Sequence, residues 1–387
     1  MKQILQILKT HGVLIAYFFA ALFVVIRNYF LPWGDLFGVG GNYSHYNNYL
    51  IFKQSFIHLV QQTNLYQLYP LEHYDFYKYP PIFALFMGPF YVLPDFGGYL
   101  IWTLLNLFVP IYAIKQMGLL ISNRNQLLLL AILPEAITAA LNSQSNGLVV
   151  GLLLLSIDAL IRERTFSAVL FISLSGFIKI FGFLFFLIFL LFPNQFKKGV
   201  VFSFFICLIL VITPAIFGGM KTLFWQYENW IFLLKNDHQA FVKYSVMGWL
   251  QSWFHVFPSK NLILVLGLAI QILPLLLNWK NRQNRSFLVA YSSSLIVWMV
   301  IFNHMAESAT FIISVLGVFY FLAAKDTLGF VELFLGLIVF AFTILGPTDI
   351  YPVEIREWIV KDLQLKVFPC IAIWFYMLYD SLIIKHS

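Results

Sequence analysis

The chain has 387 residues, of which 61% are hydrophobic and 11% are charged. A soluble domain carries about a quarter charged residues, so this composition excludes a soluble globular protein and indicates an integral membrane protein. The formal net charge of +7 is explained by Lys and Arg residues that collect in cytoplasmic loops. Because no basic run is interleaved with aromatic residues, we expect no nucleic-acid partner.

A transmembrane helix needs about twenty mostly apolar residues. The first such run follows a short basic lead and has no small-residue cleavage site after it, so it is predicted to be a membrane span and not a cleaved signal. The fold class is therefore an all-α polytopic membrane protein, in one integral membrane domain over residues 1–387. Ten full spans are predicted: 12–32, 99–116, 124–141, 145–161, 199–217, 261–279, 286–303, 307–324, 327–346 and 367–385.

Two further apolar runs do not fit a single straight span. The run 81–93 is too short, and we expect it either to dip into the membrane from outside and return or to cross as a short helix. The run 166–192 is too long and is interrupted by Gly176, Lys179 and Gly182. It is predicted to enter from the cytoplasm, turn near Lys179 and return.

The basic clusters orient the chain, because short loops rich in Lys and Arg stay in the cytoplasm. This rule predicts cytoplasmic termini in the plasma (inner) membrane, with the two longest loops, 33–80 and 218–260, facing outward. Loop 33–80 contains an apolar pattern typical of an amphipathic helix on the membrane surface. A similar helix is expected from Ile355 to Leu365.

Lys179 is the clearest ionisable residue inside an apolar run, since no other ionisable residue lies within a dozen positions of it. Such residues are costly in a membrane and are often functional. Two interpretations remain open. Lys179 is either a lysine that snorkels from a helix end or an outward-facing cation that holds a phosphate or pyrophosphate.

His304 and Glu307 are three residues apart at the outer end of a predicted span, a spacing that places both on one helix face. They are interpreted either as a capping or packing pair or as polar groups that reach into an external cavity. No third ligand accompanies them, and Cys207 and Cys370 sit in apolar runs. We therefore expect no metal, no disulfide and no cofactor.

The first outward loop concentrates titratable groups in the stretch HYDFYKYPPIFALF at residues 73–86. A carboxylate here can accept the proton of an attacking hydroxyl, although ordinary surface charge is the simpler interpretation for each residue alone. The prolines are expected to end the loop and begin a short helix at Pro81. Further on, the amides of NSQSNG are expected to cap the next helix or bind a sugar hydroxyl. The candidates in these two stretches and the preceding loop are Asp35, Glu72, His73, Asp75, Gln144 and Asn146.

The order of these pieces resembles glycosyltransferase family 87, whose members are GT-C membrane glycosyltransferases related to polyprenyl-phosphate-mannose-dependent mannosyltransferases. The resemblance rests on "nLY…YKYPPIFAL…LPDFGGYLIW…N" at residues 64–106, QSN at 144–146, SGFIKIFGF around Lys179 and the late FNHMAES. It implies transfer of a hexose, mannose being one candidate, from a polyprenyl-phosphate donor to a glycan or glycolipid acceptor outside the cytoplasmic leaflet, with inversion. The partners it implies are that donor, that acceptor and membrane lipid.

The resemblance also implies site residues. Lys179 and His304 would meet the phosphate, and aromatic residues such as Tyr79 would stack on sugar faces. The family's general base is an Asp about eighteen residues before Tyr66, and this chain has Asn48 there. An amide cannot accept a proton in this role. Either another carboxylate serves, or the counting is displaced, or the protein binds without transferring. The replacement candidates are Asp75 first, then Glu72, Asp35 and Glu307.

A transporter or flippase for a lipid-linked substrate is the main alternative, because it shares the hydropathy and the many spans. It predicts internal repeats and polar groups near the middle of the membrane. The sequence contains no clear repeat, and its polar groups favour one side. A non-catalytic membrane scaffold is the third alternative.

Overall fold

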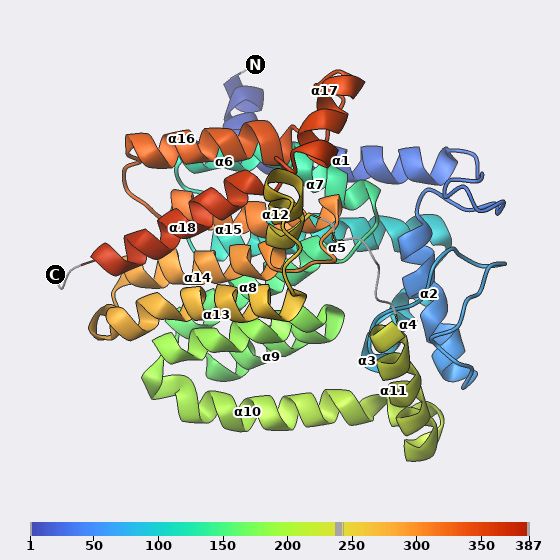
Figure 1. Ribbon diagram of the computed structural model, residues 1–387. Coiled ribbons are helices and arrows are strands. Elements are labelled where there is room, and N and C mark those ends of the chain that lie inside the picture. Colours follow the sequence, from blue (N-terminus) through green and yellow to red (C-terminus); the bar gives the residue numbers. More distant parts are fainter. Residues whose placement is uncertain (1, 237–241, 243, 385–387) are drawn as a thin grey trace. The chain divides into compact units, whose positions relative to one another are not determined.

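The computed structural model of the protein describes residues 2–236, 242 and 244–384 (Figure 1). These residues form helices joined by turns, with no strand among them. The chain divides into two compact units, each assembled from three separate stretches of sequence. The first contains residues 1–111, 140–183 and 197–240, and the second contains 112–139, 184–196 and 241–387.

Each of the ten predicted runs is helical. Five helical stretches are long and apolar enough to cross a membrane: His11–Phe30 of α1 (Lys2–Phe30), α5 (Asp95–Gln116), α6 with α7 (Asn123–Ala131, Leu133–Leu141), α10 with η2 (Pro193–Ile212, Thr213–Phe217) and α13 (Lys260–Leu277). The other five are apolar helices of 10–17 residues: α8 (Asn146–Ile161), α14 (Arg285–Ile301), η4 with α15 (Ser308–Thr310, Phe311–Ala323), α16 with η5 (Phe330–Ile338, Val339–Ile344) and α18 (Phe368–Ile383). The prediction of an α-helical polytopic membrane protein is confirmed.

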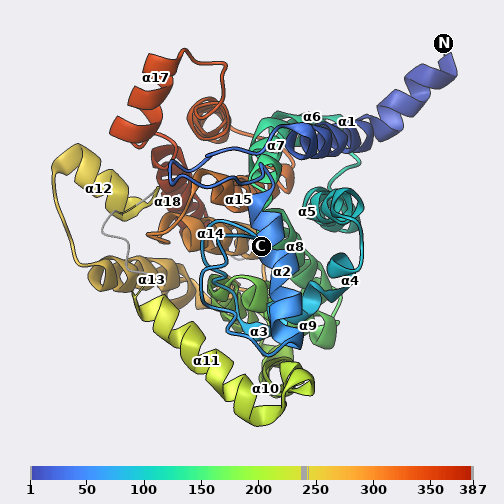
Figure 2. The same cartoon turned by 90° about the vertical axis from the view of Figure 1, so that its right-hand side faces the viewer.

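The short run after the prolines folds as two helices, α3 (Pro81–Phe86) and α4 (Gly88–Tyr91). Pro81 occupies the first turn of α3, as predicted, because its missing N–H would have no partner there. In the first unit α3 packs against α2 (Asn47–Val60), α9 (Thr165–Ile178) and α11 (Gly219–Asn236) (Figure 2).

The long run 166–192 turns at Lys179, as predicted. Helix α9 ends at Ile178, and Lys179 adopts an extended conformation before the 3₁₀ helix η1 (Ile180–Leu191) begins. After Lys179 the chain packs closely against the end of α9. A Cβ added at Gly182 would lie only 2.5 Å from Ser175 Oγ. The ammonium group therefore projects from a sharp turn and not from a continuous helix.

The first loop does contain the predicted helix, α2, but nine of its fourteen residues are buried. Its Lys53 forms an ion pair with Asp95 at 2.6 Å. Helix α11 of the second loop holds the end of α2: Gln226 donates to Thr63 O at 2.6 Å and accepts from Leu65 N at 3.1 Å. The two long loops of the sequence are thus joined within the first unit.

In the second unit, α14 packs against α15 and α18. The predicted helix in loop 347–366 is present as α17 (Val353–Glu357) followed by η6 (Trp358–Asp362). Helix α12 (Val246–Phe254), from the second long loop, is tied to the residue after η6, because Trp253 Nε1 donates to Leu363 O at 2.6 Å.

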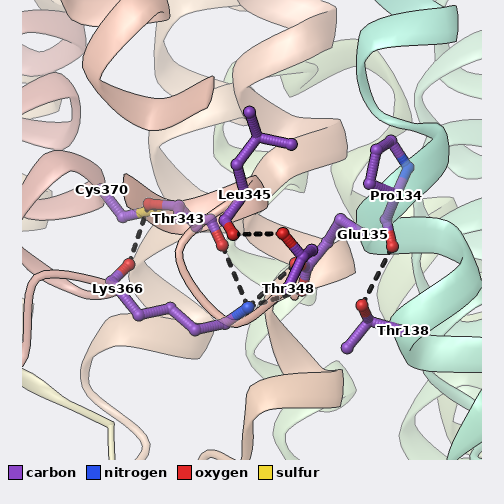
Figure 3. A network of polar contacts seen from close by, with 8 residues as sticks. All are labelled: Pro134, Glu135, Thr138, Thr343, Leu345, Thr348, Lys366 and Cys370. Carbon is purple, nitrogen blue, oxygen red and sulfur yellow. Dashed lines mark hydrogen bonds and ion pairs between the residues drawn. The ribbon is translucent and has the colours of Figure 1, made fainter. Parts of the chain in front are cut away.

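A buried ion pair lies in the core of the second unit (Figure 3). Lys366, just before α18, donates to both carboxylate oxygens of Glu135 on α7, at 2.9 and 3.1 Å. It also donates to Thr343 O at 3.1 Å. The spacing of charges in the sequence does not reveal this pair, since its members are 231 residues apart.

Candidate functional site

The turn between α7 and α8 is the centre of the candidate site in the first unit. Ser143 has a positive φ of 55°, which lets the chain reverse before α8 begins at Asn146. Two side chains of α5 hold this residue: Trp102 Nε1 donates to Ser143 O at 2.9 Å, and Ser143 Oγ donates to Tyr99 Oη at 3.0 Å. The turn is therefore built as a fixed structure.

Lys179 reaches this turn from the end of α9. Its Nζ donates to Gln144 Oε1 at 3.3 Å, and the same oxygen accepts from Asn146 Nδ2 at 2.8 Å. Three residues predicted separately as substrate-binding groups thus form one cluster. They lie beside the amino end of α8, where backbone N–H groups and the helix dipole favour an anion.

Asn48, in the second position of α2, is attached to the same turn. Its Nδ2 donates to Asn142 O at 2.8 Å, across 94 residues of sequence. The contacted residue, Asn142, precedes Gln144 by two residues. Asn48 itself is partly exposed. The structure thus joins the position of the family's expected base to the cluster around Lys179.

Asp75 is held close to the amino end of α2. The preceding residue, Tyr74, makes two hydrogen bonds with Asn47: Asn47 Nδ2 donates to Tyr74 O at 2.9 Å, and Tyr74 N donates to Asn47 Oδ1 at 2.8 Å. Asp75 itself has a φ of 76°, and its side chain is 47% exposed. Its carboxylate accepts from Phe76 N at 2.7 Å and lies 3.4 Å from Lys78 Nζ.

Glu72 is engaged at the opposite end of α2. Its carboxylate lies 3.1 Å from Nε2 of His58, which stacks on Tyr69 with a centroid distance of 3.7 Å. His58 follows Asn48 by ten residues, which is about 15 Å along a helix. Glu72 therefore has a partner remote from the Lys179 cluster.

His73 and Tyr79 are placed mainly by packing. His73 is only 3% exposed, and burial, aided by the nearby His58, lowers its pKa to about 4. It is therefore neutral at neutral pH and brings no positive charge to a phosphate. The ring of Tyr79 packs against Phe52 and Phe83, with centroid distances of 5.0 and 4.7 Å.

Asp35 organises its own loop. Its carboxylate accepts from the backbone N–H groups of Val39 at 2.8 Å and Gly40 at 2.9 Å. Hydrogen bonds to these amides hold the pKa of Asp35 below its usual value. A carboxylate stabilised in this way is a weaker base.

His304 and Glu307 belong to the second unit, and their predicted contact with substrate stays a prediction. The helical spacing expected for them is wrong, because α14 ends at Ile301 and both residues lie in the following turn. Glu307 is the N-cap of η4 and forms a capping box with Thr310. Its backbone N–H donates to Thr310 Oγ1 at 3.2 Å.

Among the described residues, no group of three His, Cys, Asp or Glu side chains could hold a metal ion. What the first unit offers is a cation with amide donors beside a helix amino end, and a carboxylate, Asp75, near the adjoining helix. This set of groups can bind an anion and accept a proton.

The sequence interpretation missed three residues that support this site. These are Tyr99, Trp102 and Asn28 of the first span, whose Nδ2 donates to Leu141 O just before the α7–α8 turn. The signal for Asn28 was available, because a polar amide inside an apolar span is a functional candidate by default. Tyr99 and Trp102 lie in the LPDFGGYLIW stretch that carries the family resemblance, and that motif was the signal for them.

The apolar helices, five of them long enough to cross a membrane, define a polytopic membrane protein among the described residues. A family model for glycosyltransferase family 87 matches residues 76–303, which is more than half of the chain. The protein belongs to glycosyltransferase family 87 and is a membrane glycosyltransferase, with a sugar donor and an acceptor as substrates. The matched region includes Tyr79, Gln144, Asn146 and Lys179. No curated protein matches the chain.

Proposed function

We propose that this glycosyltransferase moves a hexose, with mannose as the first candidate, from a polyprenyl-phosphate donor to a glycan or glycolipid acceptor on the outer face of the plasma membrane, with inversion. The observation that supports this proposal most is the convergence of Asn48, the turn from Asn142 to Asn146 and Lys179. These segments come from three distant parts of the chain, yet direct hydrogen bonds link them.

Lys179 supplies the charge that such a reaction needs. When the sugar leaves a polyprenyl phosphate, negative charge develops on the phosphate oxygen that is released. A fixed ammonium group and the amino end of α8 hold the donor phosphate and stabilise the additional charge as it forms. A lipid-linked donor also suits an ammonium group on a membrane helix, because the lipid keeps its phosphate at the membrane surface.

Asp75 is the carboxylate that we assign as general base. It is half-exposed, and the neighbouring Tyr74 is bonded to the helix that carries Asn48. Inversion requires a base that removes the proton of the acceptor hydroxyl while the phosphate departs. Glu72 instead pairs with His58, remote from Lys179, and Asp35 accepts from two backbone amides of its own loop.

The test uses purified protein in phospholipid vesicles, with radiolabelled polyprenyl-phosphate mannose as donor and a glycolipid and glycan extract of the cell envelope as acceptor. Lys179→Ala is expected to abolish transfer of label while the protein stays inserted and folded. The matched control is Lys198→Ala, which removes an equal charge from an exposed position. Near-normal transfer by the Lys179 variant would remove this residue from the site.

Sidedness is tested separately. In sealed right-side-out vesicles, label should appear in an acceptor that is added outside and cannot cross the membrane. Transfer only in inside-out vesicles would contradict the outward site. Movement of the intact donor across the membrane without transfer would instead support the flippase alternative.

A further inference from the structure

Asn28, near the end of α1, is a buried amide that contacts both halves of the candidate site. The residue is 1% exposed. Its Nδ2 donates to Leu141 O at 2.8 Å, just before the α7–α8 turn, and to His45 O at 3.2 Å, just before α2. One side-chain nitrogen therefore ties together the segments that carry Gln144 and Asn48.

Tyr99 of α5 also contacts both segments, one through its hydroxyl and the other through its ring. Its hydroxyl accepts from Asn28 Nδ2 and from Ser143 Oγ, both at 3.0 Å. Its ring stacks on Tyr46, the residue before α2, with a centroid distance of 5.3 Å and an interplanar angle of 22°. Tyr99 is fully buried, so its contacts are all within the protein.

We infer that Asn28 and Tyr99 are positioning residues, which set the separation between the amino end of α2 and the Gln144–Lys179 pair. This inference rests on the proposed function, in which α2 carries the acceptor side of the site and Lys179 holds the donor phosphate. The direct contact between the two sides is the hydrogen bond from Asn48 to Asn142 O. Asn28 and Tyr99 each contact both of the segments that this hydrogen bond joins.

The geometry explains why this separation would matter for rate. An acceptor hydroxyl and a donor carbon must approach within near-attack distance, and an error of about 1 Å can cost roughly a hundredfold in rate. Loss of the Tyr99 hydroxyl removes the partner of the Ser143 side chain, and the left-handed backbone conformation of Ser143 shapes the turn that carries Gln144. Lys179 would still bind the donor, but the donor would be displaced from the acceptor.

The test compares Tyr99→Phe and Asn28→Ala with the wild type in the vesicle assay described above. We expect kcat to fall by about ten- to a hundredfold, while KM for polyprenyl-phosphate mannose changes little. Binding of sugar-free polyprenyl phosphate, followed by tryptophan fluorescence, should also stay close to that of the wild type. Loss of folded protein alone would also lower the apparent kcat at unchanged KM, so kcat is expressed per folded molecule, counted from the amplitude of polyprenyl phosphate binding.

Asn125→Ala provides the matched control in the second unit. Asn125 is 4% exposed, and its Nδ2 also donates to two carbonyl oxygens, of Leu119 at 2.9 Å and Ala323 at 3.0 Å. It should lower the melting temperature about as much as Asn28→Ala and leave kcat per folded molecule unchanged. Equal kcat in all three variants and the wild type would overturn the positioning role.

Lys179→Ala is assayed in parallel to separate two failures. If it retains transfer, the proposed site is wrong. If it is inactive while Tyr99→Phe and Asn28→Ala keep full kcat, the site stands and only the positioning role is wrong.

Discussion

Lys366 and Glu135 form an ion pair in which both side chains are fully buried, with 2.9 Å between Nζ and Oε2. Lys366 donates additionally to Thr343 O, so its ammonium group is well supplied with acceptors (Figure 3). Such a pair contributes little net stability over an apolar pair, but removal of one partner leaves an uncompensated charge in a medium that solvates it poorly.

This relationship predicts an asymmetry between single and double substitutions. Lys366→Met alone should lower stability by about 3–5 kcal/mol, whereas Lys366→Met combined with Glu135→Leu should recover most of that loss. The midpoint of thermal unfolding in detergent measures both. Arg162→Ala, which breaks an exposed pair with Asp158, should cost at most about 1 kcal/mol. A double variant as unstable as the single one would contradict the prediction.

The assignment of Asp75 as general base is tested by removing its carboxylate and placing one at position 48 instead. Asp75→Asn should lower kcat by about 10²–10⁴-fold, because general base catalysis contributes a factor of that size. Adding Asn48→Asp places a carboxylate where the family keeps its aspartate and should restore part of the rate. The assay is initial transfer of label at saturating donor. If Glu72→Gln or Asp35→Asn abolishes transfer and Asp75→Asn does not, the assignment is wrong.

Gly182 is predicted to be irreplaceable for the turn that presents Lys179. An added Cβ would lie 2.5 Å from Ser175 Oγ and 2.8 Å from Gly176 N, so backbone as well as side chain would have to shift. Gly182→Ala should therefore reduce transfer on the order of a hundredfold by displacing the ammonium group. Gly97→Ala is the control, since nothing lies within 4 Å of its added Cβ. Equal transfer by the two variants would show that the turn tolerates the shift.

The burial of His73 predicts loss of stability in acid. Its pKa in the folded protein is about 4, against an ordinary value of 6.5, so the unfolded chain binds a proton more readily. The contribution of His73 to the free energy of unfolding is therefore fully present above pH 6.5. It falls by about 3 kcal/mol in total as the pH falls towards 4. Unfolding midpoints between pH 7 and pH 4 should fall more steeply for the wild type than for His73→Gln. Parallel pH dependences would contradict this.

Much of the helical framework could be predicted from local sequence. The apolar runs are helical because a lipid environment leaves backbone groups no partners except one another. Pro81 begins α3 and Lys179 breaks the long run, as expected from a missing N–H and from an ionisable group flanked by glycines. Lengths were less predictable: five of the ten runs are helices of 10–17 residues.

The candidate site was predictable in part. Lys179, Gln144 and Asn146 were singled out separately, and the structure brings them together. The sequence could not rank the candidate carboxylates, because the fold supplies their partners. These are a histidine for Glu72 and two backbone amides for Asp35. The spacing of His304 and Glu307 suggested a helix face, but the helix ends before them.

The sequence by itself determined that the protein is an α-helical membrane protein, where its helices run and which family it belongs to, because hydropathy and local motifs are properties of neighbouring residues. Only the tertiary structure decided that Asn48 meets the α7–α8 turn, that Asn28 and Tyr99 hold both segments, and that Lys366 finds Glu135. These are contacts between residues far apart in the chain. Such contacts form because buried polar groups need hydrogen-bond partners, and the packing of the helices determines which partners are within reach. A local sequence pattern does not contain this information.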